Sequence, residues 1–90
     1  MQHTLKTDRE IFKAVQDGHK TFEIRKDDRG YQFGDILTLC ETRYTGEEMK
    51  IGKPLEYTGA AIDVEVLHIL RGPIYGLEKG WVIMSIKRFK

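Results

Sequence analysis

Apolar side chains recur along the chain with two different periods, and each period predicts one kind of element. Ile11, Ala14 and Val15 return at the three- and four-residue spacing of one helix face. Gly18 follows at the place where a residue of left-handed conformation commonly ends a helix. The pattern therefore predicts one amphipathic helix over residues 8–17.

The residues just before this helix add a second signal. "MQHTLKT", at the start of the chain, is a short candidate strand, and it runs directly into "TDRE". Thr7 and Glu10 in "TDRE" have the spacing of a capping box, in which each side chain bonds the other residue's main-chain amide. We therefore expect Thr7 to be the N-cap of the helix.

Period-two alternation of apolar and polar side chains marks the later strands. The segments concerned are residues 20–26, 35–42, 60–70 and 80–89. In the first of them, Phe22 and Ile24 are expected to face the core. Glu23 and Arg25 then share the opposite face. Along the last two segments, one face carries Ile62, Val64, Val66, Val82, Met84 and Ile86.

Three connections complete the expected fold. Residues 28–35 and 71–80 are glycine-containing loops, and residues 44–58 form an open loop or a loose hairpin extension. Several short strands with one helix can bury their alternating faces by curling into a barrel, which also removes exposed edges. We therefore predict an α+β chain of mostly β structure. It is a small, mostly antiparallel barrel or pseudo-barrel, with one helix after the first strand.

Composition limits the class of protein without naming it. The 90 residues suit a single domain, residues 1–90, and 40% hydrophobic with 32% charged residues is typical of a folded soluble chain. The net charge of +1 excludes a strongly basic nucleic-acid tail but leaves local basic patches possible. No apolar run resembles a membrane span or a signal peptide. We expect a cytoplasmic monomer with no membrane partner.

Metal and cofactor sites are not indicated. His3, His19 and His68 are scattered and have no ligand spacing among themselves or with Cys40. Cys40 lies in the apolar run "ILTLC", where a small buried side chain is the expectation. A single cysteine permits no internal disulfide and fits a reducing compartment. We therefore expect no metal and no cofactor.

The stretch "GHKTFEIRK", residues 18–26, contains the strongest candidate site. From periodicity alone, Glu23 and Arg25 are an ordinary solvated pair on the outside of a strand. Lys20 stands at the turn before the strand, so it need not follow the alternation. If Glu23 neutralises both Lys20 and Arg25 in an empty cleft, a structural role for these three residues is favoured.

The same stretch resembles a known family. Gly18, Lys20, Glu23 and Arg25 match every defined position of the GxKxxExR signature of the ASCH domains, which belong to the PUA-like superfamily. The similarity continues through "YQFGDIL", "DVEVLHIL" and "GLEKGWVIMSI", and it resembles the small DUF3850-type branch found in bacteria and their phages. This resemblance covers essentially the whole chain, and it implies a pseudo-barrel with a helix after the first strand.

The resemblance implies that RNA or a nucleotide occupies a cleft between the helix and the barrel. A guanidinium can grip a phosphate or stack on a base, and an ammonium adds a compact charge. The expected ligand-binding residues are Lys20, Thr21, Glu23, Arg25, Lys26 and Tyr31. Lys6, His19 and Arg29 extend a basic rim, and Phe33 adds a second stacking surface beside Tyr31.

Two other functions remain open at this level. Some small bacterial ASCH proteins remove the acyl group from N4-acetylcytidine, and others are described as cutting RNA. Those deacylases are thought to use a lysine, a threonine and a glutamate. Lys20 matches the lysine, but Glu23 occupies the position of the threonine. The glutamate lies in a later helical insertion that this shorter chain lacks. Lys20 and Glu23 are the candidate catalytic residues for either reaction. A protein-interaction adaptor would instead show an exposed apolar patch on residues 44–58.

Overall fold

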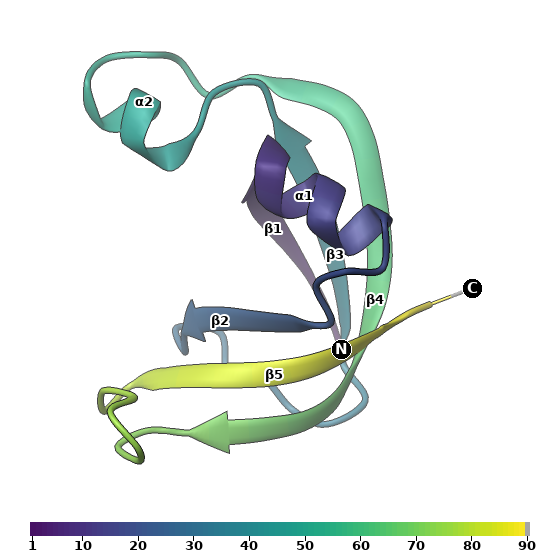
Figure 1. Ribbon diagram of the computed structural model, residues 1–90, viewed down its shortest axis with the longest axis vertical. Helices are drawn as coiled ribbons and strands as arrows, with labels where there is room; N and C mark the ends of the chain where they lie inside the picture. The colour runs from purple at the N-terminus through teal and green to yellow at the C-terminus, as the bar shows by residue number, and fades with distance from the viewer. Residues whose placement is uncertain (90) are drawn as a thin grey trace.

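A computed structural model describes residues 1–89 of the chain as one curled sheet with two short helices (Figure 1). The elements are β1 (Gln2–Asp8), α1 (Arg9–Gln16), β2 (Phe22–Lys26), β3 (Ile36–Thr42), α2 (Gly46–Lys50), β4 (Tyr57–Arg71) and β5 (Trp81–Arg88). The strand order is β1-β3-β4-β5-β2. β1 pairs with β3 in parallel, and the other neighbours are antiparallel. The predicted small α+β pseudo-barrel is confirmed.

The long strand β4 gives the sheet its curl. Its first half pairs with β3 and its second half pairs with β5, so it belongs to both halves of the sheet. A bulge lies between Val66 and His68 in the ladder with β5, and bulges increase local bending and twist. The bend brings β1 and β2, at opposite ends of the strand order, toward each other (Figure 1).

The concave side of this sheet holds the hydrophobic core. α1 covers part of it by packing against β1 and β3, with Phe12 and Val15 buried. The alternation predicted for β4 and β5 is confirmed, because all six residues of the stated face are buried. The core comprises Leu5, Phe12, Val15, Tyr31, Leu37, Leu39, Ile62, Val64, Val66, Val82, Met84 and Ile86.

The helix α1 is confirmed to within one residue at each end, but its predicted capping box is wrong. Asp8 is the N-cap and makes no capping hydrogen bond through its side chain. Thr7 belongs to β1 instead, where it is buried. The Asp8 carboxylate accepts a hydrogen bond from the Gly46 amide at 3.1 Å, so a distant segment uses the group that could have capped the helix.

A capping box does occur, but in the segment 44–58, where we expected a loop or a loose hairpin. Thr45 and Glu48 bond each other's amides at 3.1 and 2.9 Å and so begin α2. A helix of five residues is too short to show a helical period in its apolar side chains, so the sequence pattern does not predict α2. No helix in residues 1–89 has the length and apolar character needed to cross a membrane.

The predicted orientation of β2 is also wrong. Phe22 and Ile24 are 45% and 48% exposed, whereas Glu23 between them is only 2% exposed. Glu23 lies opposite Met84, whose side chain belongs to the buried face of β5. Alternation defines the two faces of a strand, but it cannot decide which face is inside when neighbouring cations compensate a buried carboxylate.

Candidate functional site

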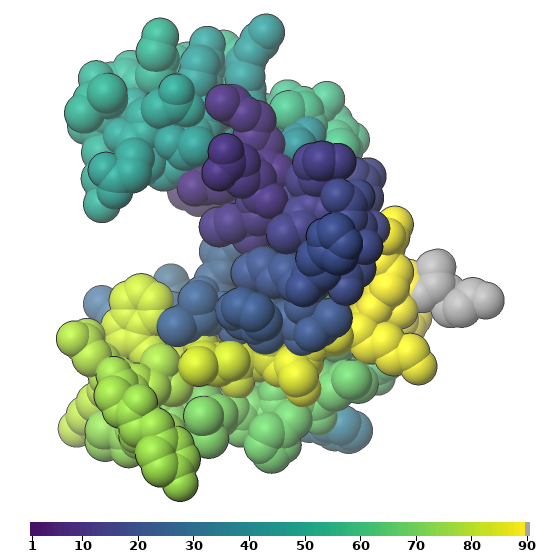
Figure 2. Space-filling view, viewed as in Figure 1, coloured from purple at the N-terminus to yellow at the C-terminus, as the bar shows by residue number. Residues whose placement is uncertain are grey.

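A cleft of about 500 Å³ lies between β1 and β2, and we call it the β1/β2 cleft. It is also lined by the start of α1, the loop after β2, and Trp81 at the start of β5. In the space-filling view, the purple β1–α1 segment and the blue β2 segment form the inner end of a hollow (Figure 2). The cleft therefore occupies the place where a closed barrel would have a β1–β2 ladder.

Two arginine side chains bridge this gap. Arg25 donates from Nη2 to the main-chain oxygen of Lys6 at 3.0 Å, and Arg29 donates from Nη1 to that of Thr4 at 3.2 Å. Thr4 and Lys6 are two residues apart on an edge strand, so their main-chain groups point away from β3. Guanidinium groups thus satisfy the carbonyls that a neighbouring strand would otherwise take.

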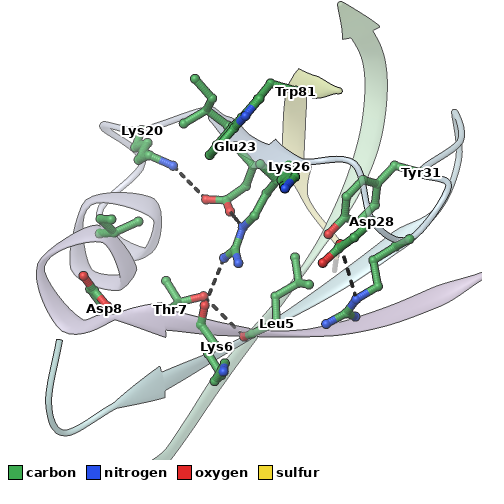
Figure 3. Close-up of a pocket in the computed structure, with 14 residues that line it drawn as sticks. Leu5, Lys6, Thr7, Asp8, Lys20, Glu23, Lys26, Asp28, Tyr31 and Trp81 are labelled. Carbon is green, nitrogen blue, oxygen red and sulfur yellow. Dashed lines mark hydrogen bonds and ion pairs between the residues drawn. The ribbon is translucent and has the colours of Figure 1, made fainter. Parts of the chain in front are cut away.

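Glu23 forms the centre of the site. Its Oε1 atom accepts from Lys20 Nζ at 2.7 Å, and its Oε2 atom accepts from Arg25 Nε at 3.0 Å (Figure 3). Lys20 Nζ also donates to the Phe22 oxygen at 2.6 Å and lies 4.7 Å from the centre of the Phe22 ring. Both carboxylate oxygens are therefore paired with cations, which stabilises a nearly buried negative charge.

Through these bonds, Lys20, Glu23 and Arg25 hold β2 in place. Glu23 joins Lys20 before β2 to Arg25 within β2, and Arg25 continues the network to β1. Glu23 therefore neutralises both Lys20 and Arg25. Arg25 also lines the cleft, so the same guanidinium that holds β1 and β2 together is within reach of a ligand there.

The surroundings of Tyr31 differ from the exposed stacking position that we expected. The residue is 1% exposed, and its ring packs edge-on against His3 with centroids 5.0 Å apart. Its amide donates to Asp27 Oδ1 at 3.1 Å, and its carbonyl accepts from Arg71 Nη2 at 2.8 Å. Tyr31 is thus held from both sides and cannot offer a ring face to a base.

The hydroxyl of Tyr31 is nevertheless available. Tyr31 lines the β1/β2 cleft, and its hydroxyl has no hydrogen-bond partner within residues 1–89. Every fully buried side-chain nitrogen or oxygen in this part of the chain does have a partner. Burial raises the pKa of this hydroxyl although Arg25 and Arg29 act to lower it, so it stays protonated and can donate or accept.

His3, which packs against the Tyr31 ring, forms a buried pair with Asp35. His3 Nε2 donates to Asp35 Oδ2 across 2.9 Å, and the Gln32 amide donates to the same oxygen at 3.0 Å. Burial by itself raises the pKa of Asp35. Hydrogen bonds from His3, from Gln32 and from the amino group of Met1 outweigh burial, so the net pKa lies below its ordinary value. Asp35 is therefore a carboxylate at neutral pH.

The cleft is positively charged overall. Five basic and three acidic residues line it, and the acidic residues are Asp8, Glu23 and Asp28. Asp28 forms a salt bridge with Arg29 at 3.8 Å. Lys6 and Lys26 form no salt bridge within residues 1–89. Both lysines are exposed. They can therefore meet an anion without first breaking an internal pair.

The structure brings together five of the six residues that we predicted to bind a ligand. Lys20, Glu23, Arg25, Lys26 and Tyr31 all line the β1/β2 cleft. The expectations for three other residues are not supported, because Thr21, His19 and Phe33 are not part of its lining. Thr21 lines a second cavity, and Phe33 is 75% exposed on the loop before β3.

Sequence reasoning missed the apolar wall of the cleft. Leu5, on β1, and Ile24, on β2, line it from its two sides. Trp81, which is half-buried at the start of β5, also lines the cleft. Alternation in β1 marks Leu5 as an inward residue, but only the sheet order reveals that it faces β2. Within residues 1–89, no three histidine, cysteine or acidic side chains gather as metal ligands would.

The fold and the site define a small half-open β-barrel domain with a basic cleft between its edge strands. The chain belongs to the family described as "Domain of unknown function (DUF3850)", whose model matches residues 2–86. No curated protein matches the sequence.

Proposed function

We propose that the β1/β2 cleft binds RNA or a nucleotide. The observation that carries the proposal is the lining of the cleft. It combines a net excess of basic side chains, the free Tyr31 hydroxyl and the half-buried ring of Trp81. Lysines and arginines provide the phosphate contacts of nucleic-acid sites, and aromatic rings stack on unpaired bases.

The GxKxxExR signature supports the same proposal, because its resemblance to ASCH domains of the PUA-like superfamily implies a ligand in this cleft. The cleft volume of about 500 Å³ suits one nucleotide rather than a duplex. A single-stranded RNA would place one base between Trp81 and the apolar wall, and its phosphates near Lys6 and Lys26. The proposal places the protein in the cytoplasm, which its single free cysteine fits.

The test is a titration of fluorescent single-stranded RNA and of free nucleotides at several salt concentrations. We expect affinity to fall steeply with salt, and Arg25→Ala to abolish binding while the variant still shows a cooperative unfolding transition. Arg43→Ala is the matched control, since Arg43 is an exposed arginine that does not line the cleft. Binding that is absent, insensitive to salt or equal in the Arg25 variant would refute the proposal.

A further inference from the structure

A second cavity, of about 340 Å³, lies on another part of the molecule, between the end of α1 and the free end of β5. We call it the α1/β5 groove. In Figure 1, β5 continues past the start of β2 toward the C-terminus, while the chain before β2 turns away to α1. The groove occupies the space where β2 would lie if it were longer. The groove shares only Lys20 with the β1/β2 cleft, and the inference drawn from it does not depend on the function proposed for that cleft.

The floor of the groove is apolar. Val15 of α1, Val64 of β4 and Ile86 of β5 line it, and all three are buried. Leu67 completes the floor and is 39% exposed. It stands at the β4 bulge, which can turn a side chain away from its regular direction. An apolar side chain placed here would cover these aliphatic groups.

The rim of the groove is basic, although one of its cations, Lys20, is already paired with Glu23 of the β1/β2 cleft. Lys20, Lys87 and Arg88 line it, and none of the nine lining residues is acidic. Lys87 and Arg88 are exposed and form no salt bridge within residues 1–89. The charge of the groove therefore complements an acidic ligand with an apolar side chain.

The main chain offers a third means of recognition. The ladder between β2 and β5 ends where the Ile86 amide donates to the Thr21 oxygen at 3.0 Å. Alternate residues of a strand direct their main-chain groups to the same side, so the Arg88 amide and carbonyl point beyond that end. His19 and Lys20 do not continue the ladder, because their amides donate to the Ala14 oxygen at the end of α1. Arg88 therefore has a free ladder position within the described chain.

We infer that the α1/β5 groove docks an extended, acidic and apolar segment of a partner protein. The segment adds as a short strand opposite Arg88, in line with β2, so that its main chain pairs with the free position of β5. One apolar side chain enters the groove over Val15 and Leu67. The acidic side chains on either side of it meet Lys87 and Arg88, which sets the direction and the charge preference.

The experiment uses the peptide acetyl-Glu-Leu-Glu-Leu-Glu-amide and the ¹⁵N-labelled protein, with binding followed by NMR. We expect shift changes centred on Val15, Leu67 and Arg88, and none centred on Glu23. The basic peptide acetyl-Lys-Leu-Lys-Leu-Lys-amide and an N-methylated form of the acidic peptide serve as ligand controls. Both should bind at least about tenfold more weakly, since one lacks the charge and the other lacks the main-chain donors.

Variants at exposed positions test the same surface without disturbing the core. Lys87→Glu and Leu67→Ser should each weaken binding about fivefold or more, whereas Lys79→Glu, an exposed lysine outside the groove, should not. The double variant Lys87→Glu, Arg88→Glu should prefer the basic peptide. Equal affinity for both peptides, shift changes outside the groove, or occupation by decanoate but not by peptide would overturn the inference. So would self-association of the chain through this face in sedimentation velocity.

Discussion

Arg25 Nη2 lies 3.0 Å from the main-chain oxygen of Lys6, and this hydrogen bond joins the two edge strands that the sheet leaves unpaired. The same arginine pairs with Glu23, whose other oxygen pairs with Lys20. One side chain thus connects a nearly buried carboxylate to the opposite wall of the cleft. The stability of β2 and the shape of the cleft therefore depend on the same few bonds.

The first prediction concerns Glu23. Replacing it by glutamine keeps the size of the side chain but leaves Lys20 and Arg25 without a counter-charge. Because both cations are partly exposed, we expect a loss of about 1–3 kcal/mol in the free energy of unfolding. Urea denaturation of the wild type and Glu23→Gln measures this loss.

The matched control for this measurement is Glu47→Gln. Glu47 also pairs with a lysine three residues away, but its side chain is 88% exposed. We expect a change of at most about 0.5 kcal/mol there, as for other surface ion pairs. Equal effects of the two substitutions would show that the Glu23 network contributes nothing special to stability.

The second prediction tests which face of β2 is inside. Ile24 is 48% exposed and Ile62 is 3% exposed, so the two isoleucines are a matched pair. Ile62→Ala should lower the free energy of unfolding by about 2–5 kcal/mol, because it leaves a cavity in the core. Ile24→Ala should cost about 1 kcal/mol or less. A larger cost for Ile24 than for Ile62 would contradict the structure.

The third prediction is a pH dependence of stability. The pKa of Asp35 is lowered in the folded state relative to its ordinary value of 3.8. The folded state therefore favours the carboxylate, and Asp35 contributes its stability above the unfolded-state pKa. This contribution is lost as the pH falls through the lower, folded-state pKa.

Asp35→Asn provides the measurement. The difference in unfolding free energy between the wild type and this variant should be largest above about pH 5, and it should shrink as the pH falls below 3.8. Glu48 also has a lowered pKa, through its hydrogen bond with the Thr45 amide, but the variant leaves that group in place. A difference that grows on acidification would be the wrong sign.

The fourth prediction separates charge from hydrogen bonding in the proposed RNA site. Lys26→Gln removes a free cation, so the slope of log affinity against log salt should become shallower by about 0.7 for single-stranded RNA. Tyr31→Phe removes only a hydroxyl, so it should weaken binding and leave the slope unchanged. A Lys26 variant with an unaltered slope, or a Tyr31 variant with an altered one, would assign the phosphate contacts elsewhere.

Much of the fold could be predicted because its signals are local. The helix α1 and the alternation of β4 and β5 depend on neighbouring residues, and the structure confirms them. Within the predicted helix face, however, Val15 is buried whereas Ile11 is 40% exposed. The segment containing α2 is different. A capping box at Thr45 begins its helix. The same pattern predicts an N-cap at Thr7 instead, where β1 continues.

The site was harder to predict because its parts are distant in the sequence. The signature in residues 18–26 identified one wall of the cleft, but the other wall is β1, which three strands separate from β2 in the sheet order. Tyr31 packs against His3, 28 residues earlier, and its carbonyl accepts a hydrogen bond from Arg71, 40 residues later. Arg25 also bonds the Lys6 carbonyl, 19 residues earlier. Short-range periodicity does not contain these relationships.

The strand order also has a consequence for how the protein is made. The first 26 residues supply both β1 and β2, yet β2 has only β5 as a sheet neighbour. During synthesis, nearly every cleft residue therefore leaves the ribosome before β5, the neighbour of β2, has been made. A chain that stops before Trp81 would carry the whole GxKxxExR signature and still have no cleft, because β2 would lack its only neighbour in the sheet.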